Sequence, residues 1–138
     1  VLPQKVRLRG TVRTLDDDVR DLAEARVRDI VTHTAAAHQC TADITYDRGY
    51  PITVNHAENT VFAADAAEKI TPGVWRDTPP IMAGEDFSYM LEKRPGAYLF
   101  LGQGTDAGLH NPNYNFNDEV APIGASFFAK LVETVQPL

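Results

Sequence analysis

The first 47 residues constrain the fold of this chain most, because they read as a strand, a helix and a second strand. Residues 5–14 (KVRLRGTVRT) and 41–47 (TADITYD) alternate apolar and polar side chains, as strands with one buried face do. Two strands and one helix leave an apolar face uncovered and cannot finish a sheet by themselves. We therefore expect an α/β fold in which these strands join a larger sheet.

The helix between the two strands has clear start and stop signals. Asp16, Asp17 and Asp18 stand where acids can cap a first turn and favour the helix dipole. We expect the helix to end near Ala37 or His38. One apolar stripe at three- and four-residue spacing predicts the face that packs: Val19, Leu22, Ala23, Val27, Ile30, Val31 and Thr34.

The rest of the chain mixes helices with short strand candidates. A Gly/Pro connection at 48–56 is the best candidate for a domain boundary. Asn55 and Glu58 have the spacing of a capping box, which predicts a second helix running to about Ile70. Further elements are expected as a strand at 74–77, a short helix at 86–93, a strand buried on both faces at 97–101 and an amphipathic helix at 123–135.

Charge and cysteine content argue against several classes of protein. The 19 acidic and 13 basic residues give a net charge of −6, whereas nucleic-acid binding needs a basic face. The sequence has no apolar run of about 18 residues and no signal-peptide pattern at its start, so we expect no membrane helix. The single Cys40 excludes an intrachain disulfide and suits the cytoplasm. Because the chain does not begin with methionine, we expect a fragment or a processed product.

Residues 80–118 contain the side chains best suited to chemistry. Glu85 and Asp86 form an acid pair, and His110 follows a glycine-broken loop. A neutral imidazole is a common ligand for zinc, manganese, nickel or cobalt. From composition alone, a loop histidine bound by a backbone carbonyl is the simpler interpretation, since a catalytic zinc site needs about three protein ligands.

The acid pair and the other polar side chains also have structural alternatives. In a functional role, Glu85 and Asp86 contact substrate or support a metal ligand. In a structural role, their negative charges interact favourably with the dipole at the start of a helix. Arg13 projects from the first predicted strand, where a surface ion pair is its simplest role. No familiar ligand spacing relates His110 to the nearby acids, which are Asp106, Asp118 and Glu119. The remaining histidines, His33, His38 and His56, are expected on helix surfaces or helix ends.

Several ordered motifs give the chain a family resemblance. MAGEDFSYML, PGAYLFLGQG and LHNPNYNFNDEVAPIGASFFAKLVE resemble the C-terminal motifs of the metal-dependent aminoacylase/carboxypeptidase superfamily. Upstream, RGTVRTLDDDVR and YDRGYPITVNHAENT fit the same branch, that of hippurate hydrolases and auxin–amino-acid amidohydrolases. The resemblance covers essentially the whole chain.

The resemblance implies two partial domains. Residues 1–48 would be the C-terminal half of an α+β lid that usually dimerises, and residues 49–138 the last part of a mixed-sheet α/β catalytic domain. It also implies an enzyme that hydrolyses the amide bond of small N-acyl amino acids and forms a homodimer through its lid.

The resemblance also implies roles for the candidate residues. His110 matches the family's C-terminal metal ligand, and Arg13 a lid arginine that holds a substrate carboxylate, for which a planar guanidinium is well suited. Glu85 and Asp86 match a site-proximal acidic motif. The other metal ligands and the general-base glutamate of the family have no counterpart in this sequence, so we expect this chain alone to bind no metal and to be inactive. Alternatives are a non-catalytic dimerisation or binding module and a peptidase or deacetylase with the same metal chemistry.

Overall fold

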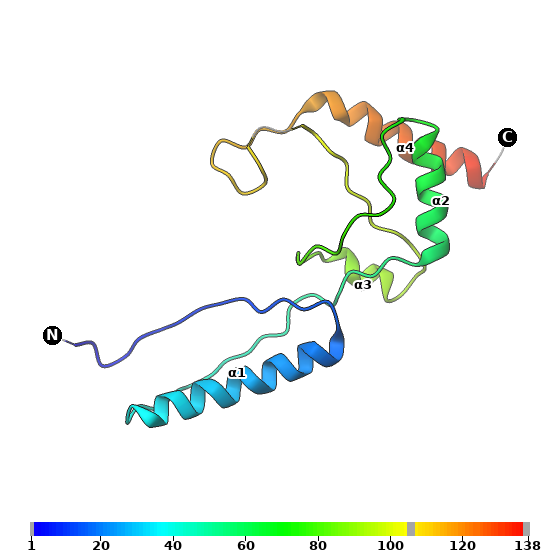
Figure 1. Cartoon of the computed structure of the whole chain (residues 1–138). Helices are drawn as coiled ribbons and strands as arrows, with labels where there is room; N and C mark the ends of the chain where they lie inside the picture. The colour runs from blue at the N-terminus through cyan, green and yellow to red at the C-terminus, as the bar shows by residue number, and fades with distance from the viewer. Residues whose placement is uncertain (1, 105–106, 137–138) are drawn as a thin grey trace. The chain divides into compact units, whose positions relative to one another are not determined.

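The computed structural model describes residues 2–104 and 107–136, and every regular element in this part of the chain is helical (Figure 1). The elements are α1 (Asp17–Ala37), α2 (Ala57–Glu68), α3 (Phe87–Leu91), the 3-10 helix η1 (Asp118–Val120) and α4 (Ala121–Val135). They fall into two compact units. The first holds the residues up to Ile52 together with Pro80–Ser88, and the second holds Thr53–Pro79 and the residues from Tyr89 onward.

Helix α1 has the bounds that the sequence predicts. Asp16 is its N-cap, and its carboxylate accepts a hydrogen bond from the Val19 N–H at 3.0 Å. Asp17 and Asp18 occupy the first turn, where their charge complements the helix dipole. The acidic start and the end at Ala37 are confirmed.

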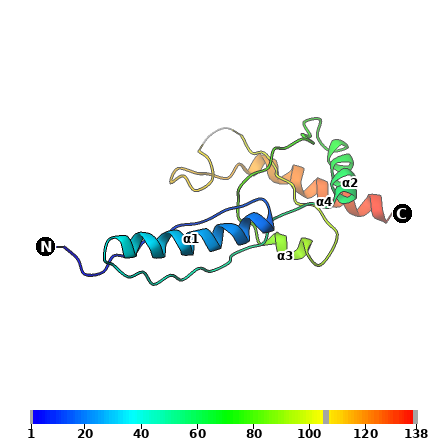
Figure 2. The same ribbon diagram turned by 60° about the horizontal axis from the view of Figure 1, so that its bottom comes forward.

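Two extended segments, 2–14 and 40–50, run along α1 in the first unit, as both views show (Figures 1 and 2). Charged side chains tie the second segment to the helix. Arg48 contacts Glu24 at 2.7 Å, and Arg28 contacts the same carboxylate at 2.8 Å. Hydrogen bonds from Arg48 and then from Arg28 hold the pKa of Glu24 below its ordinary value. Ion pairs, rather than a strand ladder, fix this segment against α1.

The expected α/β fold class, with a mixed catalytic sheet and half of an α+β lid, is wrong for residues 2–104 and 107–136, which contain no β-strand. A strand is stabilised by hydrogen bonds to a neighbouring strand about 4.8 Å away. Alternation of side chains favours extended backbone but does not provide that neighbour. Within the described residues, none of the segments predicted as strands forms a strand ladder: 5–14, 41–47, 74–77 and 97–101.

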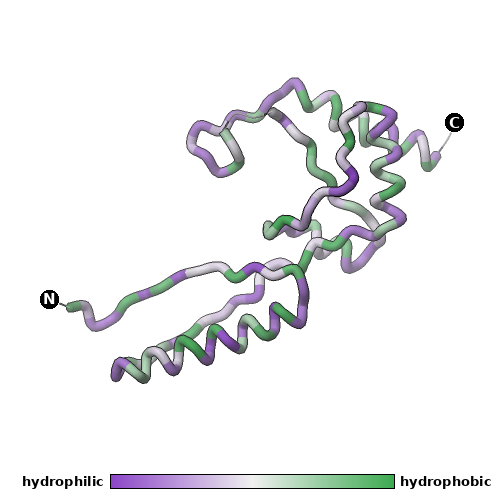
Figure 3. The backbone as a smooth tube through the Cα atoms, viewed as in Figure 1, coloured by the Kyte–Doolittle hydropathy of each residue, from purple (hydrophilic) through white to green (hydrophobic). Residues whose placement is uncertain are grey.

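The apolar stripes of the first unit are exposed as a result. Val6 and Leu8 are 74% and 90% exposed, and Leu22 and Ile30 on α1 are each 60% exposed. The colouring by hydropathy shows hydrophobic and hydrophilic residues alternating along α1 (Figure 3). The periodicity therefore predicts the helix correctly. The prediction that its apolar stripe is packed is wrong for the described residues, where Leu22 and Ile30 are exposed.

The second unit has a small core where α2 packs against α4 (Figure 1). Ala63, Ala64 and Ala66 are buried on α2, and such short side chains let a helix approach its neighbour closely. Leu91 and Val120 are also buried. This core positions η1 and α4, which follow the loop that carries His110.

The capping box predicted for α2 is not formed. His56 is the N-cap, without a side-chain hydrogen bond to the helix. The Asn55 amide instead binds the main chain of Tyr98. Helix α2 ends at Glu68, close to the predicted Ile70, and α4 ends at Val135 as predicted. Within the ranges that the structure describes, no helix is both long and apolar enough to cross a membrane.

Candidate functional site

His110 lies at the third position of a tight turn formed by residues 108–111. The Asn111 N–H donates to Gly108 O at 3.1 Å, and His110 has a φ of 67°. A positive φ at the third position is that of a type II turn, which normally carries Gly or Asn there. Histidine tolerates this conformation better than most residues, yet its Cβ still makes it unfavourable. An exposed imidazole thus occupies a position whose backbone conformation is more favourable for glycine.

The described residues do not by themselves fit a metal centre. No group of three or more His, Cys, Asp or Glu side chains comes together within residues 2–104 and 107–136. Asp118 and Glu119, two of the acids that the sequence places near His110, lie in the first turn of η1. Asp106 lies outside the described residues. His110 is therefore a single potential ligand among the described residues. One ligand does not form a catalytic metal site, so we assign this chain no metal-dependent step.

Arg13 lies beside the segment that precedes the acid pair. Its Nη1 donates to Met82 O at 2.7 Å, and both residues belong to the first unit. A guanidinium carries several N–H donors, so one bond orients the side chain and leaves it the capacity to bind a carboxylate. The structure thus brings Arg13 close to residues 80–88, which the sequence alone could not show.

Glu85 and Asp86 take different positions at the start of α3. Glu85 is half-buried, and its Oε1 accepts a hydrogen bond from the Phe87 N–H at 3.2 Å. The main-chain oxygen of Glu85 accepts from Ser88 Oγ at 2.6 Å, and Ser88 is fully buried. Asp86 is exposed. The geometry therefore gives Glu85 a local structural role at the helix start and leaves Asp86 facing solvent.

The other histidines and the cysteine lie on helix surfaces or helix ends. His33 Nδ1 is 3.0 Å from Asp29 Oδ1 on the exposed face of α1. His38 is the C-cap of α1 and His56 the N-cap of α2. Cys40 is exposed, just past the end of α1. The expectation that these histidines occupy helix surfaces and ends is confirmed.

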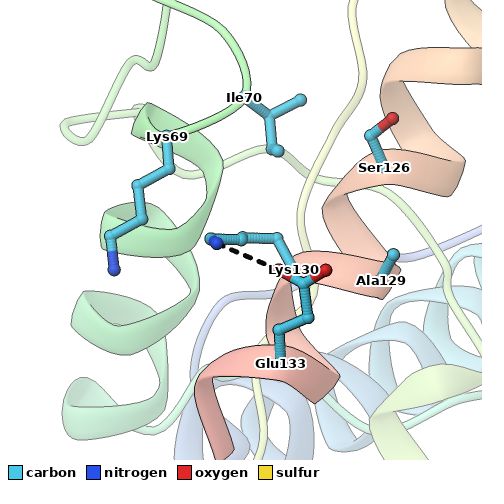
Figure 4. A pocket seen from close by; sticks show the side chains of 6 residues that line it. All are labelled: Lys69, Ile70, Ser126, Ala129, Lys130 and Glu133. Atoms are coloured by element: carbon cyan, nitrogen blue, oxygen red, sulfur yellow. Dashed lines mark hydrogen bonds and ion pairs between the residues drawn. The ribbon is translucent and has the colours of Figure 1, made fainter. Parts of the chain in front are cut away.

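A cavity of about 430 Å³ opens between the C-terminal end of α2 and the middle of α4 (Figure 4). Lys130 extends from α4 toward α2, and its Nζ contacts Glu133, three residues further along α4, at 3.0 Å. None of the residues predicted for the site lines this cavity, so it gives no support to the sequence prediction. Its lining consists of Lys69, Ile70, Ser126, Ala129, Lys130 and Glu133.

Two polar residues near His110 were not singled out from the sequence. Gln103 and Asn117 join the two sides of the His110 loop: Asn117 Nδ2 donates to Gln103 O at 3.1 Å. Asn117 is also the N-cap of η1. The sequence signal for Asn117 was available, because Asn followed by two acids before an apolar helix is a typical helix start. Gln103 gave no comparable signal.

Comparison with known proteins assigns the family. The model of peptidase family M20/M25/M40 matches residues 5–134. The chain therefore belongs to this family, which agrees with the resemblance seen in its motifs. Members of the family generally depend on metal ions.

Several curated proteins are similar to this chain. An N-acetyl-L-cysteine deacetylase of Bacillus subtilis is 38% identical over 128 residues, which cover 93% of this chain and 30% of that protein. A hippurate hydrolase of Campylobacter jejuni is 32% identical, over 95% of this chain and 35% of that protein. Thermostable carboxypeptidase 2 of Saccharolobus solfataricus is also 32% identical, over 95% and 34%. The chain spans about a third of the length of these relatives. No solved structure matches it significantly.

Proposed function

We propose that this chain is part of a metal-dependent amidohydrolase that cleaves the amide bond of small N-acyl amino acids. In this proposal His110 contributes one ligand to a metal site that residues outside this chain complete. The family membership supports the chemistry. The names of two similar proteins, an N-acetyl-L-cysteine deacetylase and a hippurate hydrolase, support the substrate class.

The conformation of His110 carries the proposal. The residue has a φ of 67° at a turn position that favours Gly or Asn, and its side chain is exposed. Residues in sparsely populated backbone conformations cluster at active sites and ligand-binding loops, although they also occur at helix ends, as Gln39 does. An imidazole held outward on a loop is available to a metal ion, and neutral imidazole is a ligand for zinc, manganese, nickel and cobalt alike.

Arg13 is proposed to bind the carboxylate of the amino-acid part of the substrate. Its bond to Met82 O orients the guanidinium close to residues 80–88. A planar guanidinium matches a carboxylate through two parallel hydrogen bonds, which an ammonium group cannot reproduce. Glu85 and Asp86 are proposed to lie near the substrate, with Glu85 acting through the start of α3.

The proposed domain roles follow the same assignment. Residues 1–48 would be the C-terminal half of a lid through which two copies dimerise, and residues 49–138 part of the catalytic domain. Apolar side chains of the first unit are exposed, among them Val6, Leu8 and Leu22. Such a surface is compatible with packing against the rest of the full-length protein or against a second copy.

The test uses the full-length gene product that contains this chain. Its hydrolysis of N-acetyl amino acids, hippurate and dipeptides is measured with zinc, manganese, cobalt or nickel added after chelation. We expect metal-dependent release of an amino acid, which His110→Asn abolishes, because asparagine suits the same turn but lacks the imidazole. Full activity in the His110→Asn enzyme would refute the ligand assignment.

The substrate panel also decides between the main proposal and a peptidase. The similarity to a carboxypeptidase favours the peptidase alternative, which predicts faster hydrolysis of dipeptides than of N-acetyl amino acids. A full-length protein that hydrolyses none of these with any metal would instead be a non-catalytic dimerisation or binding module. Arg13→Lys separates binding from chemistry, since it should raise KM for substrates with a terminal carboxylate and not for the corresponding amides.

A further inference from the structure

His56 accepts a main-chain hydrogen bond through its ring. The Gly96 N–H donates to His56 Nδ1 at 3.2 Å, and the His56 N–H donates to Gly96 O at 3.0 Å. A main-chain N–H can only donate, so Nδ1 must offer a lone pair in this contact. The ring that makes the contact is therefore neutral and carries its proton on Nε2.

The contact attaches Gly96 to the start of a helix in the second unit. His56 is the N-cap of α2, and Gly96 is half-buried. A Cβ on Gly96 would lie 3.3 Å from Cδ2 of Leu91, which is itself buried. From Gly96 the chain continues through 97–101 to Gln103, whose main-chain oxygen accepts a bond across the base of the candidate-site loop. The ring of His56 thus holds the segment that leads into this loop.

Protonation of the ring ends the contact. The incoming proton takes the Nδ1 lone pair, which is the acceptor for the Gly96 N–H, and converts Nδ1 into a donor. Two N–H groups then face each other where a hydrogen bond was. The new positive charge also lies at the N-terminus of α2, where the helix dipole disfavours a cation. Both effects act in the same direction, towards release of Gly96 from α2.

The two elements that meet at this contact also carry charged side chains. They are Glu58 in the first turn of α2, and Glu92, Lys93 and Arg94 just before Gly96. All four are exposed, and each sign occurs twice, so solvent and salt screen their opposing effects on the ring. The broken hydrogen bond is therefore the main consequence of acid.

His33 on α1 has the opposite arrangement. Its Nδ1 lies 2.8 Å from Asp29 O and 3.0 Å from Asp29 Oδ1. Both neighbours are acceptors, so this nitrogen must donate, and a positive charge on the ring strengthens the contact. Acid should therefore break the contact of His56 and preserve that of His33, which makes His33 a matched control.

We propose that His56 is an acid-released clamp, which holds Gly96 against the start of α2 while its ring is neutral and releases it when the ring is protonated. Histidine is the side chain that ordinarily changes its charge between about pH 5 and 8. The device is conformational and does not depend on the proposed function. Its consequence is a local opening of residues 96–101 in acid, while α2 stays packed against α4.

The experiment follows hydrogen exchange by NMR in the full-length gene product at about pH 7.5 and about pH 5, the range in which histidine titrates. Rates are compared with those of the unfolded chain at each pH. We expect protection of the Gly96 amide to fall by about fivefold to tenfold in acid, the equivalent of one hydrogen bond. The amides of Ala63, Ala64 and Ala66, which are buried on α2, should keep their protection. Unchanged protection at Gly96 would overturn the proposal.

Two variants separate the charge of the ring from its acceptor. His56→Asn places an amide oxygen close to the position of Nδ1 and cannot become charged, so protection of Gly96 should no longer depend on pH. His56→Leu has no acceptor and should show low protection at both pH values. His33→Asn should leave the pH dependence at Gly96 unchanged. A dependence that persists in His56→Asn, or that His33→Asn removes, would contradict the clamp.

The ring itself gives a second, independent measurement. Nitrogen chemical shifts of His56 should show an unprotonated Nδ1 and a protonated Nε2 at about pH 7.5, where the neutral ring predominates. The same titration should move the Gly96 amide resonance in step with the ring signals. A neutral ring with its proton on Nδ1 would show that the contact with Gly96 does not form in solution, and the proposal would fail.

Discussion

Asn55 and Tyr98 are joined through both polar atoms of the asparagine amide. Nδ2 donates to Tyr98 O at 2.9 Å, and the Tyr98 N–H donates to Oδ1 at 2.8 Å. His56 and Gly96 are paired as well, because the His56 N–H donates to Gly96 O at 3.0 Å and the Gly96 N–H donates to His56 Nδ1 at 3.2 Å. Side chains here give the backbone the donors and acceptors that a neighbouring strand would otherwise provide.

Removal of the Asn55 amide should loosen the backbone at Tyr98. Asn55→Ala deletes one donor and one acceptor, at a net cost of about 1 kcal/mol for each hydrogen bond. We expect faster hydrogen exchange at the Tyr98 amide, measured by NMR or mass spectrometry on the full-length protein. Asn55→Asp keeps an oxygen for the Tyr98 N–H but places a second acceptor against Tyr98 O, so it should preserve only part of the protection. Unchanged exchange in Asn55→Ala would show that other contacts hold this segment.

Asn55 also illustrates how far local sequence patterns reach. Its spacing to Glu58 predicts a capping box, but the amide binds Tyr98, which is 43 residues away in the sequence. The helices themselves were predictable, because apolar periodicity and acidic first turns act within a few residues. The strands were not, because a strand needs a partner that the alternation within 5–14 or 41–47 does not specify.

The candidate site was predictable in part for the same reason. The glycine-broken loop before His110 was visible in the sequence, and a resemblance to a family drew attention to His110. The bond from Arg13 to Met82 joins residues 69 positions apart, and the bonds of Gln103 depend on the closure of a loop. Neither can be derived from spacing along the chain.

Replacement of Gln39 by glycine should stabilise the end of α1. Gln39 has a φ of 57° and donates its N–H to Ala36 O, while the Cys40 N–H donates to Ala35 O at 2.9 Å. These bonds define a Schellman motif, whose left-handed position normally carries glycine. We expect Gln39→Gly to raise the free energy of unfolding by about 0.5–1 kcal/mol, measured by urea denaturation of the full-length protein. Gln39→Ala keeps the Cβ and should give no such gain.

Acid should weaken the attachment of residues 40–50 to α1. Hydrogen bonds from Arg48 and Arg28 lower the folded-state pKa of Glu24 from its ordinary 4.5. A lowered carboxyl pKa contributes stability above the unfolded pKa and loses it as the pH falls through the folded pKa. We therefore expect amides in 40–50 to exchange faster, relative to the unfolded chain, as the pH falls below 4.5.

Glu24→Gln tests this assignment. The variant should be less protected than the unaltered protein near neutral pH, and the two should converge in acid, where Glu24 is protonated. Combining it with Arg48→Met measures how far the two residues act through one another. Fully additive effects of the two substitutions would argue that their contact at 2.7 Å contributes nothing to stability, as is common for exposed ion pairs.

The last prediction separates the stability of the His110 turn from its function. His110→Gly removes the Cβ from a residue with a φ of 67°. The relief of backbone strain, which is of order 1 kcal/mol or more, is offset in part by the greater freedom of glycine in the unfolded chain. We expect the free energy of unfolding to stay the same or to rise by up to about 1 kcal/mol, while Co²⁺ binding by the full-length protein is lost.

His110→Ala provides the matched comparison, because it also lacks the imidazole but keeps the Cβ. Both variants should lose Co²⁺ equally, yet the alanine variant should be less stable than the glycine variant by about 1 kcal/mol. Equal stability would mean that the positive φ is not maintained in solution, which would remove the structural support for the ligand role. If the glycine variant is more stable than the unaltered protein and has lost the metal, histidine in this turn lowers the stability of the protein and serves metal binding instead.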